Sequence, residues 1–206
     1  MSSTTLFRVP SSDGLVAEVA ERVAALGPRR REDRWAKLSA CVLDAVWSIG
    51  ARYDRVVVPL VRRVLDGGAT GRLLSSATPE VDVHPLSRLQ QRFPDEEALL
   101  EVAQNRQRTS TRSGITKAKA VLGYARVLVD HGVDDLAAAN EALLSPPLLA
   151  SIDNGLRRIR GEGQHGIRRG YFWMLCGDDG RIKPDRMVLR WLAPHGVRDP
   201  EMAQQF

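Results

Sequence analysis

Two glycine-rich turns enclose a short apolar run between residues 161 and 192, and this arrangement constrains the fold more than any other part of the sequence. The apolar run spans residues 171–175, and residues 177–180 form the second turn. The first turn contains three glycines: Gly161, Gly163 and Gly166. This pattern predicts a short buried helix that begins and ends at tight turns. Beyond the second turn, Asp185 stands at the start of another helical pattern.

The remainder of the chain has the apolar spacing of amphipathic helices. Ten segments show helical spacing: 15–26, 33–49, 53–65, 85–93, 94–105, 115–129, 134–144, 147–159, 171–176 and 187–192. None of them alternates apolar and polar residues as a half-buried strand does. Pro59 is expected either in or near the first turns of its helix, where proline is tolerated, or at a kink in it, and residues 69–85 are predicted to form a loop. The sequence therefore predicts an all-α fold.

The composition limits the class of protein. Of 206 residues, 43% are hydrophobic and 27% are charged, which is typical of a globular protein and excludes a largely disordered chain. The polar N-terminal segment has no apolar core, so neither a signal peptide nor a membrane span is predicted. Cys41 and Cys176 lie in apolar helical patterns and are expected to be buried thiols in a reducing cytoplasm. The four histidines lack metal-ligand spacing, so no metal site is predicted.

The charge of the chain indicates a polyanionic partner. The formal net charge is +5 and the isoelectric point is about 9.7. Arginine outnumbers lysine, and the planar guanidinium binds phosphate oxygens through two hydrogen bonds. Many of the arginines cluster in residues 29–31, 106–112 and 157–169, which favours nucleic acid as the partner. The alternative is that the charge only keeps the protein soluble.

Four motifs in the second half of the chain follow one another in a characteristic order. Residues 114–118 read Gly-Ile-Thr-Lys-Ala and are followed, after two short helical segments, by Ile-Arg-Gly-Glu-Gly-Gln-His-Gly at 159–166. An apolar helix and a glycine turn then lead to Asp185, which precedes Val-Leu-Arg at 188–190. Over residues 35–192, this order resembles that of the helix-hairpin-helix DNA glycosylases of the endonuclease III superfamily.

The resemblance implies a fold and a set of site residues. The implied fold is a single unit over residues 1–206 with two helical lobes, one formed by 33–66 with 167–206 and the other by 85–166. Asp185 is the implied catalytic carboxylate, which stabilises positive charge on the sugar as an N-glycosidic bond breaks. The implied contacts to double-stranded DNA are Gly161, Gly163, Gly166, Arg168, Arg169 and Lys117. The implied base pocket or wedge is formed by Trp47, Ser48 and Tyr171.

The chain also departs from the family pattern. The hairpin lacks the L-P-G-V-G core, and Arg168 or a neighbour stands where bifunctional members have a Schiff-base lysine. Arginine is too basic to attack as a free amine, so base excision without lyase activity is expected. Two cysteines cannot hold a four-cysteine cluster, so no iron–sulfur cofactor is expected. The resemblance thus implies a cytoplasmic, nucleoid-associated enzyme that removes a damaged or modified base.

Each of these interpretations has an alternative. Asp185 follows Pro184 and is also in a position to cap the next helix. The glycine turn has the composition of an ordinary connection between helices, and Trp47 has the spacing of a core residue. Asp44 is expected to be a solvated or capping residue, and Lys183 is expected to be a solvated residue rather than an alternative amine nucleophile. For the whole chain, the alternatives are a non-catalytic helix-hairpin-helix DNA-binding module and a helical protein-interaction domain.

Overall fold

The structure of the chain is a computed structural model that describes residues 12–28, 34–66, 74–75, 84–162 and 165–203. The described residues are predominantly helical, which confirms the all-α class. The elements in chain order are α1 (Ser12–Ala25), β1 (Arg34–Trp35), α2 (Leu38–Trp47), the π-helix η1 (Tyr53–Val57), α3 (Val58–Asp66), β2 (Leu74–Ser75), α4 (Leu86–Arg92), α5 (Glu96–Ala103), α6 (Lys117–Asp130), α7 (Leu136–Leu143), α8 (Pro146–Arg157), α9 (Ile167–Cys176), α10 (Arg186–Leu192), the 3-10 helix η2 (Ala193–His195) and α11 (Pro200–Ala203).

The chain divides into two compact units. The larger unit spans Glu32–Lys183, and the smaller unit combines Met1–Arg31 with Pro184–Phe206. Residues 33–66 and 85–166, which were expected in separate lobes, therefore lie in the same unit. Asp185 belongs to the smaller unit.

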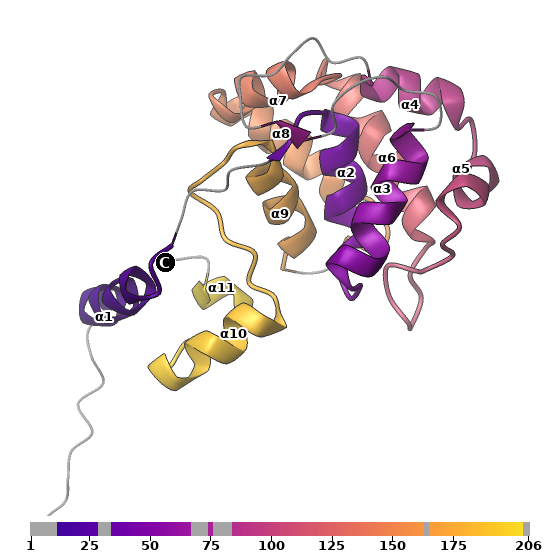
Figure 1. Cartoon of the computed structure of the whole chain (residues 1–206). Coiled ribbons are helices and arrows are strands. Elements are labelled where there is room, and N and C mark those ends of the chain that lie inside the picture. The colour runs from indigo at the N-terminus through magenta and orange to yellow at the C-terminus, as the bar shows by residue number, and fades with distance from the viewer. Residues whose placement is uncertain (1–11, 29–33, 67–73, 76–83, 163–164, 204–206) are drawn as a thin grey trace, which may run out of the picture. The chain divides into compact units, whose positions relative to one another are not determined.

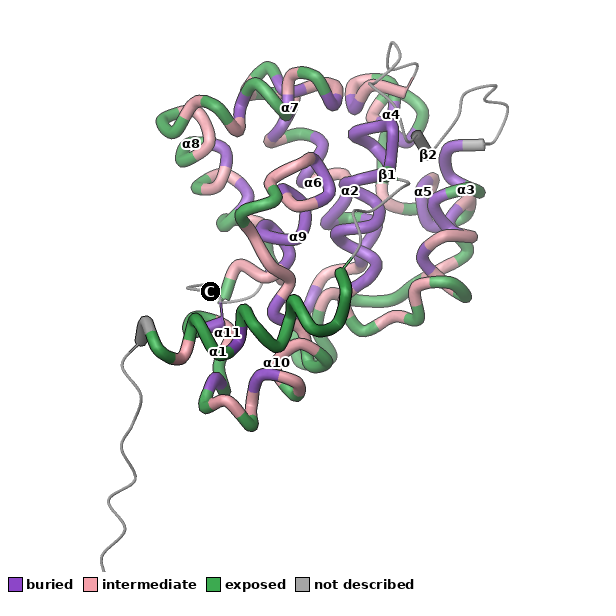
Figure 2. The backbone as a smooth tube through the Cα atoms, turned by 60° about the vertical axis from the view of Figure 1, so that its left-hand side comes forward, coloured by how far each residue is buried: buried purple, intermediate pink, exposed green. Residues whose placement is uncertain are grey.

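Helix α2 forms the centre of the larger unit. It packs against α9, α6 and α3, and α6 in turn packs against α4 (Figure 1). All of its residues from Leu38 to Trp47 are buried, and buried residues also line α6 and α9 (Figure 2). A helix that is apolar on all sides is stable only when neighbouring helices surround it. The central position of α2 therefore follows from its sequence, in which Ser39 and Asp44 are the only polar residues.

Several helices of the larger unit begin at side-chain caps. The carboxylate of Asp95 accepts a hydrogen bond from the backbone N–H of Ala98 at 2.9 Å, and Asp135 caps α7 in the same way at 2.8 Å. Thr116 caps α6 through the N–H of Lys119 at 3.2 Å. Each cap satisfies a backbone donor that the helix itself leaves unpaired, and each stabilises the helix by about 1 kcal/mol.

The structure differs from the sequence prediction mainly at the first half of the chain. The helix predicted over residues 33–49 begins only at Leu38, because Arg34 and Trp35 pair antiparallel with Ser75 and Leu74. Strands of two residues are too short to leave an alternating pattern. The segment 53–65 starts as a π-helix, and Pro59 lies in the first turn of α3, as predicted.

The smaller unit holds three α-helices among its described residues. Within it, the ring nitrogen Nδ1 of His195 lies 3.2 Å from the carboxylate of Glu18. The centre of the His195 ring lies 5.6 Å from the centre of the Trp191 ring. Val197 and Ala203 are fully buried. In neither unit is any helix of the described chain long and apolar enough to cross a membrane.

Candidate functional site

The turn between α8 and α9 depends on two glycines with positive φ angles. Gly161 has φ +89° and Gly166, the N-cap of α9, has φ +62°. Other residues rarely adopt this left-handed conformation. A Cβ atom at Gly161 would also overlap the hydroxyl of Thr109, so the turn packs directly on the loop that precedes α6. The third glycine of the predicted set, Gly163, lies outside the described residues.

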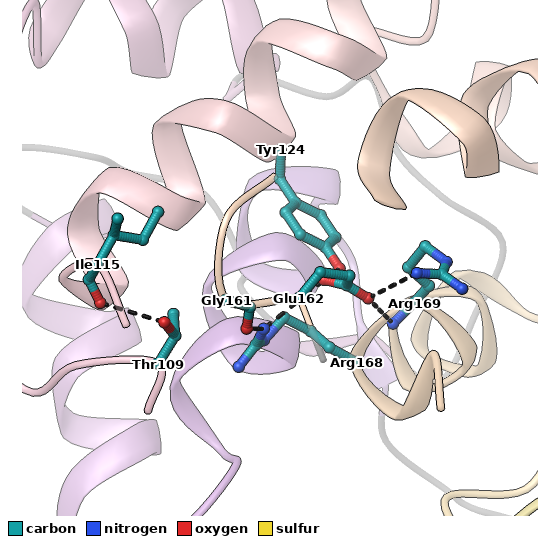
Figure 3. A network of polar contacts seen from close by, with 7 residues as sticks. All are labelled: Thr109, Ile115, Tyr124, Gly161, Glu162, Arg168 and Arg169. Carbon is teal, nitrogen blue, oxygen red and sulfur yellow. Dashed lines mark hydrogen bonds and ion pairs between the residues drawn. The ribbon is translucent and has the colours of Figure 1, made fainter. Parts of the chain in front are cut away.

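The buried carboxylate of Glu162 binds several groups around this turn (Figure 3). Glu162 is 6% exposed and accepts a hydrogen bond from the hydroxyl of Tyr124 on α6. It also accepts the backbone N–H of Arg169 at 3.1 Å. Because Gly166 has no side chain with which to cap α9, Glu162 supplies the missing acceptor for the first turn of that helix.

Glu162 also pairs with two arginines. Its carboxylate oxygens lie 3.6 Å from the guanidinium of Arg168 and 3.4 Å from that of Arg169. Burial raises the pKa of Glu162, whereas the Tyr124 hydroxyl and the two guanidinium groups lower it. Burial and the adjacent Glu162 carboxylate raise the pKa of Tyr124. The network therefore joins α6, the turn and α9 through one carboxylate.

The two arginines are not at the surface position that was expected for DNA contacts. Arg168 is 3% exposed and Arg169 is 8% exposed. Arg168 also donates a hydrogen bond to the backbone carbonyl of Gly161 (Figure 3). A buried guanidinium that is paired with a carboxylate maintains the shape of the turn, and removing its partner is costly. Their burial argues against direct contact of either guanidinium with a phosphate.

Lys117, another expected DNA contact, is likewise buried at 3% exposure. Its ammonium donates to the carbonyl oxygens of Trp47 and Ile49, each at 2.8 Å, and to the side-chain oxygen of Gln107 at 3.0 Å. The Trp47 carbonyl belongs to the last turn of α2, where a helix leaves acceptors unpaired, and the Ile49 carbonyl lies just beyond it. Burial, together with repulsion from Arg168 and Lys183, lowers the pKa of Lys117 to about 8. Lys117 therefore acts as a long-range cap of α2.

The three residues expected to form a base pocket or wedge have different environments. Trp47 is fully buried, so it is a core residue rather than an exposed wedge. Ser48 and Tyr171 are less than one-tenth exposed, and Lys183 brings them together. The Lys183 ammonium lies 3.2 Å from the Ser48 hydroxyl and 3.8 Å from the centre of the Tyr171 ring. The contact with the ring is a cation–π interaction.

Asp44 completes this group, which we call the polar cluster: Asp44, Ser48, Tyr171 and Lys183. Asp44 is fully buried and accepts hydrogen bonds from the indole of Trp35 at 2.7 Å and the hydroxyl of Tyr53 at 3.1 Å. Burial raises the pKa of Asp44, while the bonds from Trp35 and Tyr53, the charge of Lys183 and the Tyr171 hydroxyl lower it. A buried carboxylate beside an ammonium and two hydroxyls is an arrangement that can transfer protons.

Neither charged member of the polar cluster was selected from the sequence. Asp44 was expected to be a solvated or capping residue, and Lys183 was expected to be a solvated residue rather than an amine nucleophile. The available signal for Asp44 was its place inside the apolar segment that forms α2, where a carboxylate must be buried with partners. Lys183 carried no comparable signal, because its contact with Ser48, the C-cap of α2, joins residues 135 positions apart.

Asp185 is the N-cap of α10 in the smaller unit. One of its oxygens, Oδ1, accepts the backbone N–H groups of Met187 at 2.8 Å and Val188 at 3.2 Å. The side chain is half-buried. These hydrogen bonds fix the orientation of the carboxylate at the positive end of the α10 dipole. The capping interpretation is therefore confirmed, whereas catalysis by Asp185 stays a prediction.

These observations define a predominantly helical protein in which a glycine turn is held by a buried Glu–Arg–Tyr network. The chain belongs to the family described as Domain of unknown function (DUF8548), whose sequence model matches residues 13–206. Comparisons with curated proteins and with solved structures found no match. Within the described residues, no group of three or more histidine, cysteine or acidic side chains is arranged to hold a metal ion.

Proposed function

We propose that this protein binds double-stranded DNA and, like a monofunctional DNA glycosylase, extrudes a damaged or modified base and hydrolyses its N-glycosidic bond. The observation that carries the proposal is the turn between α8 and α9. Gly161 and Gly166 adopt left-handed conformations there, and the turn leads into the N-terminus of α9. Backbone N–H groups at such a turn bind phosphate oxygens without reading the base sequence.

The buried network supports this role indirectly. With both guanidinium groups of Arg168 and Arg169 engaged by Glu162, the DNA contact falls to the backbone of the turn. Because Glu162 and Arg169 hold the described ends of the turn, those residues lose little conformational entropy on binding, which favours their use as a phosphate contact. Arg168 and Arg169 are thus positioning residues in this proposal.

In the chemical step, Asp185 would provide the negative charge. As the bond between the sugar and the base breaks, its electron pair leaves with the base nitrogen, which takes up a proton, and the sugar becomes positively charged. A carboxylate held in a fixed orientation stabilises that charge, and water then adds its oxygen to the sugar carbon and releases a proton. The two backbone hydrogen bonds to Oδ1 provide the fixed orientation. No Schiff base is part of this step.

A second candidate is a DNA-binding module without catalysis. The cap formed by Asp185 favours it, because capping α10 is by itself a sufficient structural reason for an acid at that position. Both candidates require DNA binding through the turn, and they differ only in base release.

The experiment uses the full chain with duplex oligonucleotides that each carry one modified base. Binding is measured by fluorescence anisotropy at several salt concentrations, and base release is measured as strand cleavage after alkali treatment. Salt-sensitive binding with cleavage of at least one substrate is the expected result. Binding without cleavage of any substrate would favour the second candidate. Absence of duplex binding at low salt would contradict both.

A further inference from the structure

A groove of about 710 Å³ lies on the surface of the larger unit, beside α6. It is lined by residues of α4 and α6 and by the residues that precede the glycine turn. Its apolar side chains include Ile115, Leu122 and Ile159, which are half-buried and pack against the core. These three side chains form the apolar floor of the groove. A volume of this size accommodates a ligand of several residues or a small molecule.

The rim of the groove is basic. Lys119, Arg126 and Arg160 line it and are exposed, whereas Asp130 is the only carboxylate among the described lining residues. Arg126 and Asp130 lie 3.9 Å apart with most of each side chain in solvent, so this pair is weak. Three cations against one carboxylate leave an excess of positive charge around an apolar floor.

We propose that the groove binds an acidic amphipathic peptide segment of a protein partner. Aspartate and glutamate side chains of the peptide would pair with the cationic rim, and its apolar side chains would lie on the aliphatic floor. This charge complementarity gives specificity and speeds association. The proposal does not depend on the DNA-related function, which is assigned to the backbone at Gly161 and Gly166 and to Asp185, and none of these three residues lines the groove.

The lining argues against single-stranded nucleic acid as the occupant. Strand-binding grooves offer exposed aromatic rings on which bases stack. Phe93 is the only aromatic residue among the described lining residues, and it is 3% exposed. The guanidinium of Arg92 also lies 4.9 Å from its ring centre. An aliphatic floor without a stacking surface suits leucine-like side chains better than bases.

A peptide-display selection against the full chain tests the proposal. We expect the selected peptides to combine aspartate or glutamate with leucine, isoleucine or phenylalanine. A labelled selected peptide is then titrated by fluorescence anisotropy with the parent chain, with Arg126→Glu and with Arg62→Glu. Arg126 is exposed and lines the groove, whereas Arg62 is exposed on α3 and does not line it. The Arg126→Glu variant should weaken binding by about tenfold or more, and the Arg62→Glu variant by less than about twofold.

Three results would overturn the proposal. The first is a selection that yields no peptides with this composition. The second is equal binding of the selected peptide to parent and Arg126→Glu chains, with circular dichroism showing that both are folded. The third is displacement of the peptide by an unlabelled oligothymidine that itself binds the parent chain and not Arg126→Glu, which would assign the groove to nucleic acid.

Discussion

Arg169 contacts Glu162 twice, through its backbone N–H at 3.1 Å and through its guanidinium at 3.4 Å. The Glu162 side chain, which precedes the N-cap Gly166, therefore caps α9 and pairs with the buried charge of Arg169 at the same time. Arg168 and Tyr124 bind the same carboxylate. The glycine turn owes its shape to this arrangement, and its stability should depend on one negative charge.

Removal of that charge tests the network. We expect Glu162→Gln to lower the free energy of unfolding by about 3–5 kcal/mol, because two buried guanidinium groups lose their partner. Urea unfolding followed by circular dichroism measures the change. Glu97→Gln is the matched control, since the Glu97–Arg106 pair is about 70% exposed on both sides and should contribute less than about 1 kcal/mol. Similar losses for both variants would contradict the role given to Glu162.

The pKa of Lys117 predicts a pH dependence of stability. Folding lowers the pKa of this ammonium from 10.5 to about 8. Between these two values the unfolded chain binds more protons than the folded chain, so the contribution of Lys117 to stability rises with pH across this window. We expect the difference in unfolding free energy between the parent and Lys117→Met to grow, on the order of 3 kcal/mol, from pH 8 to above pH 10. A pH-independent difference would contradict the lowered pKa.

The close packing of Gly161 predicts a difference between two glycine substitutions. Both Gly161 and Gly132 have positive φ angles, but only at Gly161 would a Cβ overlap a neighbour, the Thr109 side chain. Gly132→Ala should therefore cost only the strain of the left-handed conformation, about 1–2 kcal/mol. Gly161→Ala should cost clearly more and should also weaken duplex binding. Thermal unfolding measures the loss of stability of each variant. Equal losses for Gly161→Ala and Gly132→Ala would show that the Thr109 side chain moves aside at little cost.

The polar cluster predicts that the pKa of Asp44 depends on Lys183. The charge of Lys183 lowers the pKa of Asp44, against the larger effect of burial. In Lys183→Met, the pKa of the Asp44 carboxyl should therefore rise further. Carbon-detected NMR of the aspartate carboxyl groups as a function of pH reports this shift. An unchanged Asp44 titration would show that Lys183 does not act on this carboxylate.

Most of the helices could be predicted from the sequence, because the apolar spacing that buries one face of a helix is a local property. The elements that could not be predicted are too short to show a periodic pattern. The pairing of β1 with β2 involves two residues on each strand, and the short helices η2 and α11 have too few residues for a periodic pattern. Their formation depends on contacts that a periodic pattern does not record.

The candidate site was harder to predict, because charge is visible in a sequence but its partners are not. Arg168, Arg169 and Lys117 were interpreted as surface cations, yet Glu162 and the carbonyls at the end of α2 hold them inside. Of the expected pocket residues, Ser48 and Tyr171 lie together and Trp47 does not join them. The ammonium that connects Ser48 and Tyr171 comes from Lys183, beyond α9.

The catalytic role proposed for Asp185 is tested by single-turnover base release with the Asp185→Asn variant. Asparagine caps a helix about as well as aspartate, so the substitution removes the charge and retains the cap. On a duplex that the parent chain processes, the variant should bind with unchanged affinity and release the base at least about a hundredfold more slowly. Release at the parent rate would contradict a catalytic role of Asp185 and leave only its role as the cap of α10.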